Sequence, residues 1–150
     1  RNCDGTLFLS SSDTTLNSGL FFRGRDNFLA TIEQLLIEHG MDQAAEVVLS
    51  GCSAGAVAAV LLADGLRDKI EAHTGRDVFL TVLSDSGVFP EWPQSGVPDG
   101  VFSFPQFEWI FRFTNTSESA PTSCLQKGLG WRCLQVGVAL PHVRTPVFLL

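Results

Sequence analysis

A serine flanked by small residues, Gly51-Cys52-Ser53-Ala54-Gly55, carries the clearest chemical pattern in the sequence. The pattern G-x-S-x-G follows a short apolar run and precedes a helix-forming segment, which is the context of a sharp strand-to-helix turn. Such a turn lifts the serine hydroxyl above the edge of a sheet, and small neighbours let strand and helix approach. We therefore predict that Ser53 is a nucleophile and that the Ala54 N–H can donate to an oxyanion.

A serine hydroxyl needs a general base, and the sequence offers three histidines for that role. His39 and His73 stand at the ends of predicted helices, where a solvated or capping role is the simpler interpretation. His142 follows Ser53 in the order serine, acid, histidine, but nothing around it marks an active-site loop. Asp85 ends a predicted strand and could orient a base, although its Ser-Asp-Ser-Gly context favours a turn-capping role. The sequence thus predicts a nucleophile and half of an oxyanion hole, without a convincing base.

The elements around Ser53 alternate between strand and helix, which is typical of a parallel sheet covered by helices. A short apolar run over 46–50 predicts a buried strand, and the alanine-rich run from Ala56 predicts a helix that Gly75 ends. The other expected segments are a loop over 1–19, a helix over 25–39, a strand over 78–83, a loop over 90–100, a helix over 104–113, a loop over 114–130, a short helix over 131–139 and a strand from about 146.

The last residues, Thr145 to Leu150, contain a proline followed by four large apolar residues. This pattern predicts a strand that is buried on both faces. Because such a strand normally leads into a loop, we expect residues 1–150 to be the central part of a single domain in a longer protein. The alternative is an ordinary frayed apolar terminus.

Composition excludes several function classes. The 150 residues are 45% hydrophobic and 17% charged, which predicts one globular domain and not a disordered chain. The formal net charge of −6 argues against nucleic acid as a partner, because that would require a basic face. No apolar run reaches the roughly 20 residues of a membrane span. The same acidity fits poorly with a polyanionic substrate, for which Arg23 and Arg25 are either local cationic contacts or simply solvated.

Four cysteines bear on the compartment of the protein. Their spacing shows no C-x-x-C and no Cys/His cluster, so we expect no metal site. Cys124 and Cys133 flank a loop and are either bridged or free, while Cys52 is expected to be a buried thiol and Cys3 could pair outside the chain. A glycosylation sequon at Asn115-Thr116-Ser117 is a further, weak sign of the secretory route.

Short motifs along nearly the whole chain form one ordered pattern. They are Cys3-Asp4-Gly5, Phe22-Arg23-Gly24, Leu49-Ser50-Gly51-Cys52-Ser53-Ala54-Gly55, Leu83-Ser84-Asp85-Ser86-Gly87-Val88-Phe89, Pro121-Thr122-Ser123-Cys124 and Thr145-Pro146-Val147-Phe148. This combination resembles the pectin acetylesterase family, which also includes the Notum-type carboxylesterases of animals. The latter remove a fatty acyl group from secreted signalling proteins.

The resemblance implies an α/β-hydrolase-like fold, with a mostly parallel sheet and helices on both faces, incomplete at both ends of this chain. In the family pattern Ser53 matches the nucleophile, Ala54 the residue that donates its N–H to the oxyanion hole, and Phe89 a position that can line the acyl pocket. In that pattern the other oxyanion donors precede residue 1, and the triad Asp and His follow the strand that begins at Thr145. The resemblance therefore places all of these groups outside this chain. Asp85 matches a structural aspartate instead.

The same resemblance implies the function. We expect a secreted serine carboxylesterase of the cell wall that removes acyl groups, acetyl above all, from pectic polysaccharide through an acyl-enzyme and without a cofactor. The alternatives are a Notum-like protein or lipid deacylase and an inactive hydrolase-fold binding module. The family commonly has a second glycine where this chain has Ala56, a change that should not abolish the turn. The 150 residues alone are expected to be inactive, because they lack two triad members.

Overall fold

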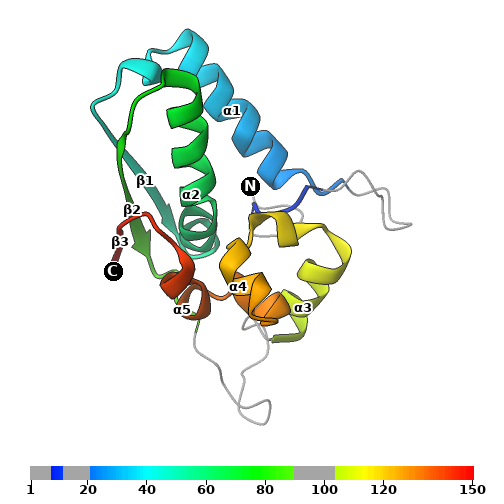
Figure 1. The fold of residues 1–150 in the computed structure, drawn as a ribbon. Coiled ribbons are helices and arrows are strands. Elements are labelled where there is room, and N and C mark those ends of the chain that lie inside the picture. The colour runs from blue at the N-terminus through cyan, green and yellow to red at the C-terminus, as the bar shows by residue number, and fades with distance from the viewer. Residues whose placement is uncertain (1–7, 12–20, 90–103) are drawn as a thin grey trace.

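The computed structural model describes residues 8–11, 21–89 and 104–150. Its centre is a parallel sheet in the order β1-β2-β3 (Figure 1). The strands are β1 (Glu46–Cys52), β2 (Phe79–Asp85) and β3 (Val147–Leu149). Val82 pairs with Leu49 on one side and with Val147 on the other, so all three strands run in one direction and their carboxyl ends meet at one edge.

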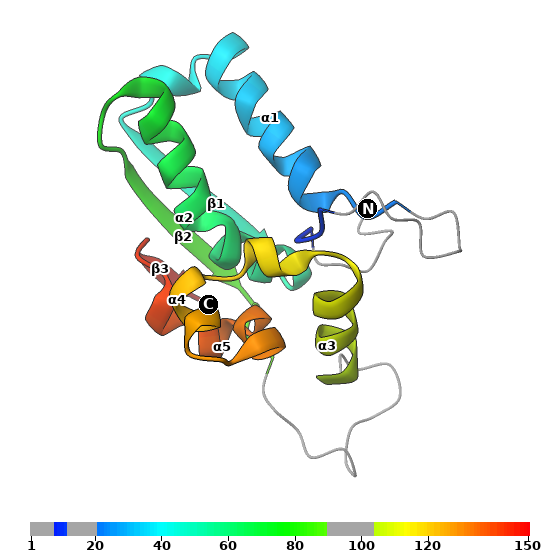
Figure 2. The same cartoon turned by 45° about the vertical axis from the view of Figure 1, so that its right-hand side comes forward.

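Two long helices cover one face of this sheet. In Figures 1 and 2, α2 (Ala54–Thr74) lies between the strands and α1 (Gly24–Glu38). The first half of α2 is buried almost continuously, because its small side chains allow close contact with both neighbours. Gly75 ends α2 in the left-handed conformation at φ 66°, and Ile32 and Leu36 of α1 are buried. Both expected helices are therefore confirmed.

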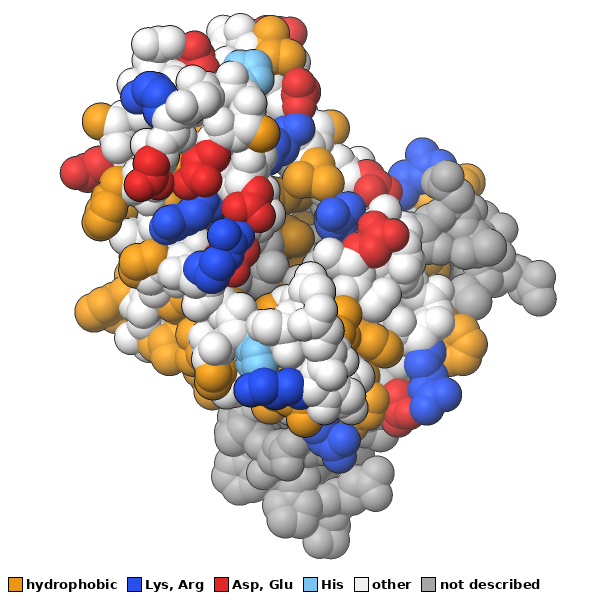
Figure 3. Space-filling model, in the orientation of Figure 1, with side chains coloured by type: hydrophobic (Ala, Val, Ile, Leu, Met, Phe, Trp, Pro, Cys, Tyr) orange, Lys and Arg blue, Asp and Glu red, His pale blue; other side chains and the backbone are white. Residues whose placement is uncertain are grey.

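The strands alternate between a covered and an uncovered face. Leu80 and Val82 point into the core, whereas Val48, Phe79 and Phe148 are 65%, 61% and 64% exposed. In Figure 3, hydrophobic side chains gather along the left edge, where Figure 1 draws the strands. Within the described residues, helices thus cover one face only, and the expectations of helices on both faces and of fully buried strands are not met. The apolar side chains on the uncovered face are typical of a sheet with a layer packed on each face, and none of the described residues forms that second layer.

The segment after residue 103 is more helical than the sequence indicates. The expected helix over 104–113 is confirmed, but 114–130 is not a simple loop. A disulfide joins Cys124 to Cys133, which settles the pairing that the sequence left open. The elements in this part of the chain, together with a 3-10 turn after α1, are η1 (Met41–Gln43), α3 (Phe104–Phe113), η3 (Thr116–Ser119), α4 (Thr122–Gln126), η4 (Gly130–Leu134), α5 (Val136–Ala139) and η5 (Leu140–His142).

The loop over 90–100, most of the loop over 1–19 and Cys3 lie outside the described residues. None of the described helices is both long enough and apolar enough to cross a bilayer.

Candidate active site

Ser53 sits in a strained turn between β1 and α2. Its backbone has φ 56° and ψ −118°, a conformation that costs energy for any residue with a side chain. The turn reverses the chain directly from the carboxyl end of β1 into the first residue of α2. Ser53 itself is exposed, so its hydroxyl is not packed away beneath the turn. This is the geometry that the G-x-S-x-G spacing predicts.

Close backbone packing beneath the turn explains one of its two glycines. A Cβ on Gly51 would overlap the carbonyl group of Gly55 and would lie 2.8 Å from the Ala56 nitrogen. A Cβ on Gly55 would meet nothing within 4 Å, so crowding among the described residues does not explain this second glycine. At Ala56 the small side chain matters, because a Cβ on Gly87 would come within 2.7 Å of the Ala56 Cβ. The absence of a side chain at Gly87 therefore leaves room for the Ala56 side chain.

The Ser53 hydroxyl and the Ala54 amide are both left without partners inside α2. Serine often caps a helix with its side chain, but the Ser53 side chain makes no such capping hydrogen bond. The Ser53 carbonyl instead accepts the N–H groups of Ala56 and Val57, at 3.0 and 3.2 Å. Ala54 is the first residue of the helix, so its N–H has no acceptor within α2. The first turn carries no acidic residue that would compete for the positive end of the helix dipole.

The end of β2 lies against the same turn. The Ser53 N–H donates to the Asp85 carbonyl oxygen at 2.8 Å. The Asp85 carboxylate is exposed and accepts a hydrogen bond from the Ser86 hydroxyl at 2.8 Å, in a turn where Ser86 has a φ of 55°. These contacts fit the turn-capping interpretation of Asp85.

Cys52 lies beside Asp85 in the parallel register. The negative charge of Asp85, followed by the hydrogen bond that its carboxylate accepts from the thiol and by slight desolvation, raises the pKa of Cys52 above the ordinary value. The side chain is exposed, so the expectation of a buried thiol is wrong. The reason is the alternation of β1, which turns Cys52 toward the uncovered face of the sheet.

None of the three histidines is hydrogen-bonded to Ser53. His39 caps the carboxyl end of α1, and His73 lies in the last turn of α2, at the far end of that 21-residue helix from Ser53. At 1.5 Å per residue this separation is roughly 30 Å. His142 is half-buried and its Nδ1 lies 2.9 Å from the Ser123 hydroxyl oxygen. Among the described residues, no histidine is therefore hydrogen-bonded to the candidate nucleophile.

Phe89 follows the turn after β2 and packs on α3. Its ring lies 6.4 Å from that of Phe107, and its side chain is half-buried against the core. The contact anchors Phe89 to α3, four residues after the carboxyl end of β2. Its role in an acyl pocket remains a prediction.

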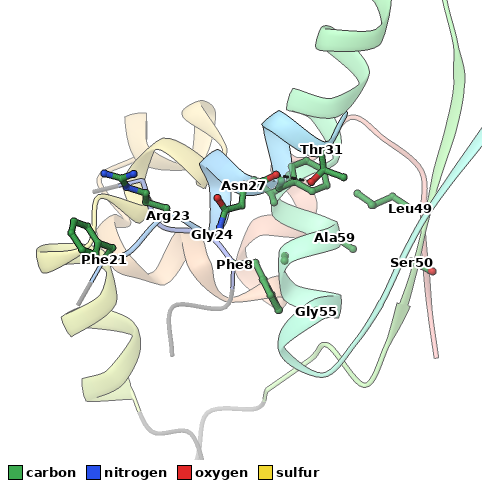
Figure 4. A pocket seen from close by; sticks show the side chains of 13 residues that line it. Phe8, Phe21, Arg23, Gly24, Asn27, Thr31, Leu49, Ser50, Gly55 and Ala59 are labelled. Atoms are coloured by element: carbon green, nitrogen blue, oxygen red, sulfur yellow. Dashed lines mark hydrogen bonds between the residues drawn. The ribbon is translucent and has the colours of Figure 1, made fainter. Parts of the chain in front are cut away.

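An apolar cavity lies to one side of the strand-to-helix turn at Ser53. Its volume is about 570 Å³, and α1, α2 and β1 form its walls with Phe8 (Figure 4). Gly55 reaches its lining, but Ser53 does not. Asn27 and Thr31 of α1 lie across it from Leu49, and the Thr31 hydroxyl donates to the Asn27 carbonyl oxygen at 2.8 Å. The cavity therefore adjoins the helix that follows Ser53 without containing the hydroxyl.

The two arginines near the start of α1, Arg23 and Arg25, contact other side chains. Arg25 forms an ion pair with Glu118 at 3.3 Å, and the guanidinium of Arg23 lies 5.1 Å from the centre of the Phe21 ring. Both are therefore more than solvated side chains. Within residues 8–11, 21–89 and 104–150, no group of three or more His, Cys, Asp or Glu side chains could hold a metal ion.

Sequence reasoning missed Asp64, on the middle of α2. Its carboxylate accepts hydrogen bonds from the backbone N–H groups of Arg144 and Thr145 and from the Thr145 hydroxyl. Burial by itself would raise the Asp64 pKa, but these hydrogen bonds and the charge of Arg144 outweigh it and hold the pKa below its usual value. The sequence feature that could have indicated this role is the position of Asp64 directly after the apolar run of the predicted helix.

A family comparison covers the whole chain. The family model described as "Pectinacetylesterase" matches residues 1–150. The chain belongs to the pectinacetylesterase family. Among curated relatives, pectin acetylesterase 5 of Arabidopsis thaliana is 32% identical over 152 residues, which cover 100% of this chain and 34% of that protein. The palmitoleoyl-protein carboxylesterase notum1 of Xenopus laevis is 29% identical and is matched over 99% of this chain and 31% of its own length.

A solved structure gives the same result for the fold. The Wnt deacylase Notum from Drosophila superposes with a TM-score of 0.77 at 23% identity, covering 93% of this chain and 40% of that one. The pectinacetylesterase chain thus has an α/β-hydrolase-like fold, of which the described residues contain three parallel strands and their helices. It spans about a third of the length of the curated relatives that it matches.

Proposed function

We propose that the protein containing this pectinacetylesterase chain is a serine carboxylesterase with Ser53 as its nucleophile. The observation that carries the proposal is the exposed Ser53 residue in a positive-φ turn, directly before the amino end of α2. An ordinary helix cap would have the hydroxyl hydrogen-bonded to the first turn, and it is not. Family membership supports the same chemistry.

The first half of the reaction forms an acyl-enzyme. The Ser53 Oγ attacks the ester carbonyl carbon while a histidine base takes its proton, and the carbonyl oxygen becomes an oxyanion. The Ala54 N–H, at the positive end of the α2 dipole, donates to that oxyanion. Collapse of the intermediate breaks the bond to the alcohol oxygen, which leaves with the proton from the base.

The second half of the reaction returns the serine. A water molecule, deprotonated by the same histidine, attacks the acyl carbon, and the Ser53 Oγ leaves with that proton. The products are a carboxylic acid and free enzyme, and no cofactor takes part. The histidine and its aspartate are proposed to follow β3 in the longer protein, with further oxyanion donors before Arg1. Residues 1–150 alone are then inactive.

The proposed substrate is an acetyl ester on pectic polysaccharide, in line with the names of the Arabidopsis relatives. A long acyl ester on a protein is the second candidate, because relatives named as palmitoleoyl-protein carboxylesterases match the chain at similar identity. A hydrolase-fold module that binds without catalysis is the third.

A secreted, cell-wall location is part of the same proposal. The Cys124–Cys133 disulfide supports it, since such bridges persist in oxidising compartments. Asn115 of the sequon is exposed, and its amide donates to the Ser11 carbonyl and to Glu118. Glycosylation there would displace one of these two contacts.

The experiment compares Ser53→Ala with wild-type full-length protein. We expect kcat for acetate release from acetylated pectin, and for p-nitrophenyl acetate, to fall by at least about a thousandfold. Ser123→Ala, which removes the hydroxyl partner of His142, is the matched control and keeps the wild-type rate. Wild-type turnover by Ser53→Ala would reject the assigned nucleophile. Turnover only on a peptide with a long acyl ester would favour the second candidate, and pectin binding without any turnover would favour the third.

A further inference from the structure

A carboxylate on α2 holds the chain just before β3 begins. The two oxygens of Asp64 accept the Arg144 N–H at 3.0 Å, the Thr145 N–H at 2.9 Å and the Thr145 hydroxyl at 2.8 Å. The Asp64 side chain is 23% exposed and Thr145 is 3% exposed, so the two bonds to Thr145 are partly shielded from water, while the bond to the Arg144 N–H is exposed. Two consecutive backbone amides are thereby fixed to one helix position.

The fixed residues decide where β3 meets β2. Pro146, next along the chain, accepts the Val82 N–H at 2.8 Å. Strand β3 is only three residues long, and a short strand without an anchor can slip in register. A slip of one residue would turn every side chain of β3 to the other face and would shift its end by about 3.3 Å.

The far end of β3 lies at the same edge of the sheet as the candidate nucleophile, with the end of β2 between them. The Leu150 N–H donates to the Ser84 carbonyl at 2.9 Å, and the Ser86 N–H donates to the Leu150 carbonyl at 3.1 Å. The backbone carbonyl oxygen of Asp85, the residue between these two serines, accepts the Ser53 N–H. Whatever follows Leu150 therefore leaves the sheet at the edge that carries the Ser53 hydroxyl, where open α/β sheets place their reacting groups.

We propose that Asp64 is a positioning residue for the esterase reaction, because it fixes the register of β3 and so the place at which the chain after Leu150 reaches Ser53. The inference rests on the proposed function. Asp64 acts through backbone amides and touches neither Ser53 nor the substrate. Asparagine replaces it only in part: its amide oxygen can accept the two Thr145 bonds made by Oδ1, but its NH2 would then face the Arg144 N–H that Oδ2 accepts.

The structure supplies a matched control one helical turn away. Asp68 lies on the same face of α2 and contacts the Arg144 guanidinium at 2.7 Å, but it accepts no backbone N–H of the segment before β3. Its side chain is 59% exposed. Arg144 forms an ion pair with each carboxylate, at 3.5 Å to Asp64 and 2.7 Å to Asp68. Asp68→Asn therefore removes a charge on α2 and one Arg144 ion pair without removing the backbone anchor.

The test uses the full-length protein with Asp64→Asn and Asp68→Asn. We expect Asp64→Asn to lower kcat for p-nitrophenyl acetate by between about tenfold and a hundredfold with KM unchanged, because an error near 1 Å in placing catalytic groups costs that much. Hydrogen exchange should accelerate in residues 82–86 and 147–150, while the amides of β1 and α2 keep their protection. Asp68→Asn should keep wild-type values for each measurement.

Several outcomes would overturn the inference. They are wild-type kcat in Asp64→Asn, an equal loss in Asp68→Asn, or faster exchange over the whole domain. If Asp64→Asn does not fold, Thr145→Val, which removes one of the bonds, takes its place: lower kcat with faster exchange confined to β3 and its partner supports the role, and unchanged kcat rejects it. Ser53→Ala separates the two proposals, because its full activity would reject the nucleophile, whatever Asp64 does.

Discussion

The backbone N–H of Ser53 donates to the carbonyl oxygen of Asp85 across 2.8 Å, so the end of β2 holds the turn that carries the candidate nucleophile. The strained Ser53 conformation persists because this bond and the packing of α2 on β1 together determine it. The turn is therefore a property of two strands and a helix, and substitutions that open any of these contacts should release it.

The first prediction concerns crowding beneath the turn. Gly51→Ala places a Cβ against the Gly55 carbonyl and the Ala56 nitrogen, which are backbone atoms that cannot move independently. We expect the full-length protein to lose about 1–3 kcal/mol of unfolding free energy and most of its esterase activity. Gly65→Ala is the control, since its Cβ meets nothing within 4 Å in the interior of α2 and should stabilise by about 0.5–1 kcal/mol. Urea denaturation measures both, and equal stability of the two variants would contradict the packing argument.

The second prediction concerns the thiol next to Ser53. The charge of Asp85 raises the pKa of Cys52 because it disfavours the thiolate. Asp85→Asn removes that charge, so the pKa falls, the thiolate fraction at pH 8 increases and alkylation by iodoacetamide becomes faster. Asp77→Asn, just before the other end of β2, serves as the control and should leave the rate unchanged. Mass spectrometry of the Cys52 peptide gives the rates, and a slower reaction in Asp85→Asn would refute the assignment.

The strand-to-helix turn at Ser53 could be predicted because the sequence features that specify it lie within a few residues of it. Tight turns, small residues and helix formers act over a few residues, so the sequence around Ser53 specifies strand, turn and helix together. The helix that ends at Gly75 is another such case. The helical content of 114–130 could not be predicted in this way. Its short turns depend on the Cys124–Cys133 bridge and on packing, and they lack the repeating apolar pattern of a longer helix.

Contacts between segments that are far apart in the sequence could not be predicted from the sequence alone. Asp64 and Thr145 are 81 residues apart, and nothing local indicates that one binds the other. The exposure of Cys52 depends on which face of β1 is covered, and this too is a tertiary property. The apolar residues after Pro146 predict a strand that is buried on both faces, but such a composition shows only that the strand needs covering layers and not which segments supply them.

The third prediction concerns the disulfide. By the loop-entropy model, a bridge that spans nine positions contributes on the order of 2–3 kcal/mol. Cys124→Ser should therefore lower Tm by several degrees, and dithiothreitol should lower the wild-type Tm to a similar value without affecting the variant further. Cys52→Ser provides the comparison, because it leaves the bridge intact and should remain as sensitive to reduction as the wild type. Calorimetry with and without the reductant distinguishes these cases.

The fourth prediction is a dependence of stability on acid pH through Asp64. Its pKa in the folded protein lies below 3.8, the value of a free aspartate, so the unfolded chain binds the proton more readily than the native one. The carboxylate therefore stabilises the fold fully above that ordinary value, and the contribution disappears as the pH falls through the lower, folded-state pKa.

Asp64→Asn should accordingly unfold more easily than wild type at pH 7, by about 1–3 kcal/mol for hydrogen bonds to a charged group. The difference between the two proteins should shrink as the pH is lowered from 5 towards 2. Denaturant titrations at each pH measure it, with Asp68→Asn as a variant that keeps the backbone anchor. A difference that stayed constant over this range would mean that Asp64 holds β3 by shape and not by its charge, because only the ionised carboxylate offers both oxygens to the N–H groups of Arg144 and Thr145.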